Sequence, residues 1–487
     1  MPSLPDSSPR DNDRERTLGA RESLAIWLLL VSAFVVILNE TVMGVALPKL
    51  MHELDITAAA GQWLTAAFLL TMSVVIPITG MLIQRVRTRT LFIVAMSLFS
   101  AGTLLAAVAP GFEILLVGRV VQACGTAIMM PLLMTTVTTT VPKHQRGMIM
   151  GRVSVVISVA PALGPTLSGV VLQFLNWRWL FLIVLPIAII ALVLGALRMP
   201  NVGEVRKARL DPLSVLLTLL GFGGLVYGLS AIGEQASGQA SVPPWIPIVI
   251  GVAGLAAFVW RQVSLQREDR ALLDLRTFRT RQFAFGALLF GIFAMALFGS
   301  LILLPIYVQD VLGYDTLVSG LVLLPGGLAM ALLGQYVGRR VDRRGARPVL
   351  IPGIIITTVS LWAMTLFTDT TPLWQVIATH VVMSIGLANT FTPLFEVSLG
   401  SLPSSLASHG SATVATVQQV AGAAGTALFV TVMTLGAVSA AGSPEAVDSH
   451  ALAEGTRLAF LTGGVISTLA VIVALFIRDP EGRTEAV

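Results

Sequence analysis

The feature that most constrains this chain is a series of long apolar blocks separated by short segments that carry most of the charge. A helix rises about 1.5 Å per residue, so about 20 apolar residues span the roughly 30 Å hydrocarbon core of a bilayer. The blocks are continuously apolar rather than alternating, which argues against membrane-spanning strands. The sequence therefore predicts an all-α integral membrane protein.

Composition agrees with this prediction. Of the 487 residues, 55% are hydrophobic and only 12% are charged, whereas soluble domains have about 25% charged residues. Fourteen blocks are long enough to cross a bilayer, and their even number predicts that both termini lie on one side. The blocks are 24–48, 61–83, 90–109, 112–139, 147–174, 178–197, 212–233, 243–264, 282–308, 316–338, 348–367, 373–397, 410–437 and 456–477.

The arginines gather in the loops after even-numbered blocks, which predicts that these loops and both termini are cytoplasmic. Examples are Arg85, Arg87 and Arg89 after the second block. This topology accounts for the net charge of +5 without a nucleic-acid partner.

An internal repeat divides the chain. Gly80 opens "GMLIQRVRTRT" and Gly338, 258 residues later, opens "GRRVDRRGARP"; the first and ninth blocks begin at the same offset. Such repeats are typical of transporters. The sequence predicts two six-helix bundles with an inserted two-helix hairpin. The predicted units are a disordered tail (1–23), the first bundle (24–200), the linker and hairpin (201–270), the second bundle (271–478) and a short tail (479–487).

A carboxylate lies inside the first block, in "ILNETVMGVALP". Its cost near the middle of a bilayer is about 2.5–3.5 kcal/mol, so a function is expected. Glu40 lies about 24 Å of helix from Leu24 and about 12 Å from Pro48. We predict that Glu40 carries the transported proton and that Asn39 orients it or contacts substrate. The alternative is a structural hydrogen bond between helices.

The fourth block contains "LLVGRVVQACG", in which Arg119, Gln122 and Thr126 share one helix face. Arg119 is about 10 Å of helix from Phe112, where the block begins, so snorkelling to the interface is the alternative to an internal role. The fifth block contains "VAPALGPTLSGVV". Its small residues favour close packing and its proline a bend, and a simple packing kink is the alternative reading.

These motifs resemble the fourteen-helix drug:proton antiporter branch of the major facilitator superfamily, especially the lincomycin-resistance-like exporters. The resemblance implies proton transfer at Arg119 with Glu40. The fifth-block motif implies that transport is export rather than uptake. The resemblance also implies gating by the loop motif. The copy of the loop motif after the second block departs from the family pattern at Gln84 and Arg87. The alternative, that the basic residues of this loop only fix the topology, is therefore stronger there. The motif residues are Gly164, Pro165 and Gly169 in the fifth block, and Gly80, Arg85, Gly338, Asp342, Arg343, Gly345 and Arg347 in the loops.

Other polar or aromatic residues are candidates for a substrate cavity, although residues of these kinds are also common as interfacial anchors or as links between helices. They are Asn39, Trp63, Gln122, Tyr307, Asn389 and Glu396.

No nucleotide-binding loop, nucleophile–base set or metal-ligand cluster is visible in the sequence, so neither an enzyme nor a cofactor is expected. The single cysteine, Cys124, is interpreted as a packing residue. The predicted function is proton-coupled export of amphipathic drugs or antibiotics by a monomer in the bacterial inner membrane, with a small substrate, protons and lipid as partners. The alternatives are export of an endogenous metabolite or lipid and, more remotely, a non-transporting sensor.

Overall fold

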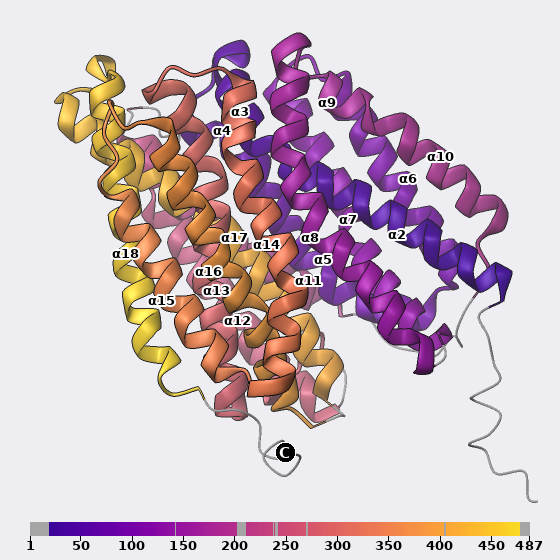
Figure 1. Cartoon of the computed structure of the whole chain (residues 1–487). Helices are drawn as coiled ribbons and strands as arrows, with labels where there is room; N and C mark the ends of the chain where they lie inside the picture. The colour runs from indigo at the N-terminus through magenta and orange to yellow at the C-terminus, as the bar shows by residue number, and fades with distance from the viewer. Residues whose placement is uncertain are drawn as a thin grey trace, which may run out of the picture.

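The computed structural model describes residues 19–141, 143–201, 211–236, 238, 242–268, 271–403 and 406–477, and every regular element within these ranges is a helix (Figure 1). The first half of the molecule consists of α2 (Ala20–Thr41), α3 (Met43–Leu54), α4 (Ala58–Gly61), α5 (Trp63–Arg85), α6 (Thr88–Ala107), α7 (Phe112–Thr140), α8 (Lys143–Phe174), α9 (Trp179–Leu182) and α10 (Val184–Arg198).

A pair of helices follows, α11 (Pro212–Ala236) and α12 (Trp245–Leu265), which pack along each other and then lead through η1 (Gln266–Glu268) and η2 (Leu275–Arg279). The second half consists of α13 (Arg281–Ile306), a π-helical turn η3 (Tyr307–Val311), α14 (Thr316–Arg344), α15 (Arg347–Met364), α16 (Leu373–Gly400), α17 (Ala407–Ala441), η5 (Pro444–Ala446) and α18 (Ser449–Ala474).

Thirteen helical segments of the described chain are long and apolar enough to cross a membrane. They correspond to thirteen of the fourteen predicted blocks. The remaining block, 147–174, lies within the 32-residue helix α8, whose apolar part, Val159–Phe174, is shorter. The predicted helical membrane protein is therefore confirmed, while the fourteenth span remains a prediction.

The first block differs in detail from its prediction, because it forms two helices that are interrupted at Val42. The second of them, α3, continues to Leu54 and ends where Asp55 adopts a left-handed conformation with φ of 53°. Glu40 is thus the penultimate residue of α2, close to the interruption.

The helices of the second half pack on one another as those of the first half do. In the first half, α7 packs against α5 and α6, and α2 packs against α8; in the second, α16 packs against α14 and α15, and α13 packs against α17. The internal repeat seen in the sequence therefore extends to the helix packing.

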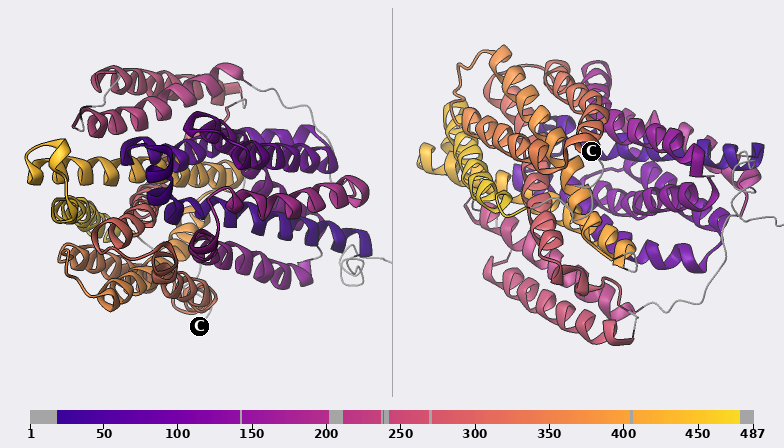
Figure 2. Two further views of the ribbon diagram at one scale, coloured as in Figure 1. Left: turned by 90° about the horizontal axis from the view of Figure 1, so that it is seen from above. Right: turned by 60° about the horizontal axis from the view of Figure 1, so that its bottom comes forward.

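The two halves meet along two helix pairs, α8 with α14 and α5 with α17. One end of the molecule, here called the closed end, carries residues 44–52, 165–169 and 301–320. There Gln309 donates from Nε2 to the Val45 carbonyl at 3.2 Å, and Thr166 donates to the Gly320 carbonyl at 3.4 Å. At the opposite end, where α2 begins and α18 ends, the ribbons of the two halves diverge (Figures 1 and 2). The α11–α12 pair lies along the side of the molecule (Figure 2).

Candidate functional site

Helix α7 holds Arg119 fully inside the first half, with no exposed surface. Its Nη1 donates to Gln122 Oε1 at 2.7 Å, and Gln122 Nε2 donates to Thr103 at 2.8 Å. Thr126 donates to the Gln122 carbonyl at 3.1 Å. The predicted shared face is therefore present, and the side chain points inward instead of snorkelling to an interface.

Neutral oxygens from two further helices surround the guanidinium. From α2, Asn39 Oδ1 accepts from Arg119 Nη1 at 3.0 Å; from α5, the Leu64 carbonyl accepts from Nε at 3.2 Å. The ring of Phe68 lies 4.0 Å from the guanidinium carbon, in cation–π geometry. Sequence reasoning missed these partners, because they depend on how α2 and α5 are rotated relative to α7.

Glu40 is half-buried beside this cluster, and its charge is near enough to interact with that of Arg119. Yet no ion pair joins the two side chains in the described structure, because Asn39 is the residue of α2 that faces the guanidinium. One residue along a helix is a rotation of about 100°, which turns Glu40 to a neighbouring face.

Two hydrogen-bond donors of the cluster lack acceptors. Both Arg119 Nη2 and Asn39 Nδ2 are buried without a partner. A buried donor without an acceptor costs about 1–3 kcal/mol, so a carboxylate or another oxygen that reached this point would be bound favourably. In this conformation, the site therefore has two buried donors that can bind an anionic or polar oxygen.

Helix α8 links the Glu40 region to the second half. A Cβ at Gly164 would lie 2.9 Å from the Leu38 carbonyl of α2 and would also overlap Thr41, so the two helices touch next to Glu40. One and a half turns further on, a Cβ at Gly169 would lie 2.6 Å from the Thr316 carbonyl of α14. Glycine is therefore required at both contacts.

The loop motifs are partly formed. Gly345 ends α14 with a φ of 83°, as expected for a tight turn that requires glycine. Gly80 and Gly338 make no close helix contact in this conformation, since a Cβ at either position would meet nothing within 4 Å. Arg85 is half-buried, Arg343 is exposed, and Arg347 donates to the Leu475 carbonyl at 3.4 Å; the side chain of Asp342 lies outside the described residues.

The remaining cavity candidates are engaged in packing. Trp63 donates from Nε1 to Ser230 of α11 at 3.1 Å. Tyr307 is fully buried, with its hydroxyl 2.5 Å from the Thr368 carbonyl. Asn389 donates to the Ile385 carbonyl of its own helix at 2.8 Å, and Glu396 is half-buried near the other end of α16. In this conformation, the polar groups that come together are Arg119, Gln122 and Asn39.

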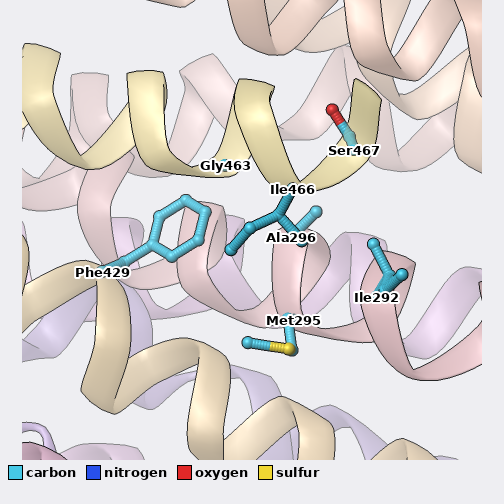
Figure 3. A pocket seen from close by; sticks show the side chains of 7 residues that line it. All are labelled: Ile292, Met295, Ala296, Phe429, Gly463, Ile466 and Ser467. Atoms are coloured by element: carbon cyan, nitrogen blue, oxygen red, sulfur yellow. The ribbon is translucent and has the colours of Figure 1, made fainter. Parts of the chain in front are cut away.

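Two further features narrow the choice of site. A small apolar gap of about 10 Å³ lies in the second half between α13, α17 and α18, next to Met295, Phe429 and Ile466 (Figure 3). It has room for about one water molecule and has no charged lining. Among the described residues, no three His, Cys, Asp or Glu side chains come together as metal ligands, and Cys124 is half-buried.

The helical architecture, the two similarly packed halves and the arginine buried inside the first half are features of a membrane transporter. Residues 29–426 match the family model of the Major Facilitator Superfamily, and the chain belongs to this family. It is 40% identical to lincomycin resistance protein LmrB of Listeria monocytogenes over 92% of this chain and 95% of the relative. The LmrB protein of Bacillus subtilis is 39% identical, over 92% and 94%.

Solved structures share the fold at low identity. A bacterial homologue of the human lysosomal transporter Spinster, in an inward-facing and unoccupied conformation, matches with a TM-score of 0.63 and 15% identity over 95% of this chain and 98% of that chain. The human organic anion transporter MFSD10 matches with a TM-score of 0.62 and 15% identity, over 93% and 99%. The predicted resemblance to lincomycin-resistance-like transporters is thus confirmed.

Proposed function

We propose that this chain is a proton-coupled antiporter that exports amphipathic drugs or antibiotics, lincosamides among them, across the bacterial cytoplasmic membrane. In this proposal the chain has fourteen spans and cytoplasmic termini, with α11 and α12 as an inserted hairpin. The observation that carries it is the arrangement of Glu40 beside a fully buried Arg119 whose Nη2 has no acceptor. The names of the relatives support the substrate class.

The proposed mechanism uses Glu40 as the proton carrier. An ionised carboxylate is attracted to the free Nη2, and a carboxylate–guanidinium hydrogen bond is about twice as strong as a neutral one. Protonation of Glu40 weakens that attraction and leaves Arg119 to Asn39 and Gln122, as in this conformation. Because Gly164 of α8 packs beside Glu40 and Gly169 packs on α14, movement between the halves can change the surroundings of the carboxyl group.

The driving force is sufficient for export. One elementary charge that crosses 100 mV releases about 2.3 kcal/mol, which corresponds to a concentration ratio of roughly fifty. The fold is known from the relatives to be that of a transporter, but proton coupling needs a direct test.

Everted membrane vesicles energised with lactate provide this test. We expect vesicles that contain the chain to accumulate labelled lincomycin, and a protonophore to abolish the accumulation. ATP-driven accumulation that persists with the protonophore would contradict proton coupling. A growth-inhibition panel in an efflux-deficient host defines the substrate range, and protection against no compound would favour export of an endogenous metabolite or lipid.

A further inference from the structure

A histidine lies inside the second half, where the proposed mechanism has no titratable group. His380 of α16 is only 3% exposed. Its imidazole ring hydrogen-bonds the backbone carbonyl of Leu323 in α14, while Nδ1 is buried without a partner. A histidine that served only to link two helices would be expected to have both nitrogens satisfied.

Helix α14 is shaped to receive this ring. A Cβ at Gly326 would lie 2.5 Å from His380 Cδ2, 2.7 Å from Nε2 and 2.6 Å from Ser384 Oγ. Any residue larger than glycine would therefore push the imidazole away from α14. The ring has a fitted place between α14 and α16.

His380 is the counterpart of Arg119 in the internal repeat. "VIATHVVMSIG" in α16 aligns with "LLVGRVVQACG" in α7 at an offset of 261 residues, with His380 at the position of Arg119. The packing supports this alignment. Gly125 lies against the Ala95 carbonyl and the Phe99 backbone nitrogen of α6, and Gly386 lies in the same way against the carbonyl of Gly353 and the nitrogen of Thr357 in α15.

No charged side chain of the described residues bonds to the ring. The titratable groups on the elements packed against α16, and on α16 itself, lie toward the helix ends: Arg281, Tyr307 and Asp310 on α13 and η3; Asp315, Tyr336, Arg339, Arg340, Arg343 and Arg344 on or next to α14; Arg347 on α15; His409 on α17; and Glu396 on α16. The side chain of Asp342, also on α14, lies outside the described residues. Among the described residues, His380 is therefore a titratable group with neither a carboxylate nor a cation bonded to its ring.

The segment that covers His380 also contacts the first half. Gly320 of α14 packs on the Pro165 carbonyl and on Gly169 of α8, and Leu323 follows less than one turn later. Between Leu323 and Gly326 lies Pro325, which lacks a backbone N–H and weakens the helix there. If α8 and α14 separate at the closed end, the segment of α14 that packs on His380 loses its contacts with α8.

We propose that His380 is a second proton-binding site of the transport cycle, and this rests on the proton coupling proposed above. An imidazolium needs an acceptor for each of its two N–H groups, and the closed end leaves only the Leu323 carbonyl for one of them. The ring is therefore neutral in this conformation. When the closed end opens, water reaches Nδ1 and the ring takes up a proton; when it closes, the proton leaves toward the other side.

The number of protons exchanged per substrate tests this proposal. Wild-type protein, His380→Gln and the control Ser384→Ala are reconstituted in proteoliposomes with the membrane potential clamped at zero. The steady-state lincomycin ratio is then measured against the imposed pH difference. With protons on both Glu40 and His380, a difference of one pH unit sustains a ratio of about 100 in wild type and in Ser384→Ala. In His380→Gln, which keeps a donor for the Leu323 carbonyl, it sustains about 10.

The outcomes separate the two proposals. A wild-type ratio that does not respond to pH contradicts proton coupling itself. A wild-type ratio of about 10, or the same ratio in wild type and His380→Gln, contradicts the role of His380 and leaves that of Glu40 intact. A variant that only impaired packing would change the rate or the yield of folded protein without changing this ratio. A wild-type ratio of about 10 overturns the role of His380 even if His380→Gln does not fold.

Discussion

At the scale of single residues, the main feature is that Arg119 is held by neutral oxygens and not by the nearby carboxylate. Asn39, Gln122 and the Leu64 carbonyl together satisfy Nε and Nη1 but leave Nη2 free. The guanidinium is thus fixed in place while part of its charge remains available. In the proposed mechanism, this arrangement lets a proton on Glu40 change the electrostatics of the site without moving the arginine.

Replacement of Glu40 tests this division of roles. Glu40→Gln cannot exchange a proton, so we expect uphill lincomycin accumulation in vesicles to fall to background while equilibrium binding of lincomycin changes less than about threefold. Asn39→Ala removes one neutral acceptor from Arg119 and is expected to reduce the transport rate. The lost hydrogen bond is expected to lower the free energy of unfolding by about 1 kcal/mol. Uphill accumulation by Glu40→Gln at the wild-type level would remove Glu40 from the mechanism.

The double variant Asn39→Asp with Glu40→Gln moves the acid by one position. In the structure, position 39 faces Arg119 directly, so an aspartate there is expected to form a permanent ion pair. We therefore expect the double variant to fold and to remain inactive in uphill transport. Full activity would show that the direction in which the carboxylate faces is unimportant.

The spacing of Arg119, Gln122 and Thr126 allowed their common face to be predicted from sequence, because helix geometry fixes it. The bond from Arg119 to Asn39 could not be predicted, since it depends on the rotation of α2 relative to α7. The role of His380 could not be predicted from the sequence for a similar reason. Its burial with Nδ1 unpartnered depends on how the side chains of α14 pack against α16.

At the scale of elements, a bidentate ion pair joins the start of α11 to α12. Arg261 donates from Nε and Nη2 to the two Asp211 oxygens, each at 3.0 Å, and Ser214 donates to the same carboxylate at 2.6 Å. These bonds, with that of Arg261 the largest influence, lower the pKa of Asp211 to about 2. The carboxylate is therefore ionised in the folded protein at ordinary pH.

This ion pair predicts a pH dependence of stability. Because the folded pKa is lower than the ordinary value of 3.8, the stabilisation is complete above that value and disappears as the pH falls through about 2. Asp211→Asn is expected to cost about 1 kcal/mol and to lower the Tm by about 1–2 °C at pH 6. The difference from wild type should be about half as large at pH 3, as measured by thermal unfolding in detergent. Glu445→Gln, at an exposed position, is the control and should show no difference at either pH.

Most helix ends could be predicted from the apolar blocks, because the length of a bilayer-spanning helix is fixed by membrane thickness. The interruption at Val42 could not, because the predicted block 24–48 runs through this position. The hydrogen bonds that Gln62 and Trp63 donate to Ser230 of α11 could not be predicted either, because they join segments about 168 residues apart.

At the scale of the whole molecule, the repeat predicted two similar halves, but the sequence does not determine which end of the molecule is closed. The same chain must adopt at least two arrangements during transport, and its composition is equally compatible with each. The closed end seen here depends on glycine contacts between α8 and α14, among which Gly169 and Gly320 are the closest.

Gly169→Val is expected to open the closed end, because its side chain would overlap the Thr316 carbonyl. Cysteines introduced at His52 and Asp310, whose side chains lie 3.7 Å apart across the two halves, can report this with a bifunctional maleimide in a Cys124→Ser background. We expect the cross-linking yield to fall at least threefold. Gly223→Val, at a position with nothing within 4 Å, is the matched control and should leave the yield unchanged. Equal yields in both variants would show that the α8–α14 contact does not hold the end shut.

The tight seam between α8 and α14 also determines how the protein can be blocked. With the proposed orientation, a compound in the external medium finds the route to Arg119 obstructed at this seam by backbone packed against backbone. A competitive blocker of this conformation must therefore enter the cell first and is itself exposed to export. A membrane-impermeant blocker would instead have to capture the opposite conformation, so its potency should rise with the fraction of time that the seam is open.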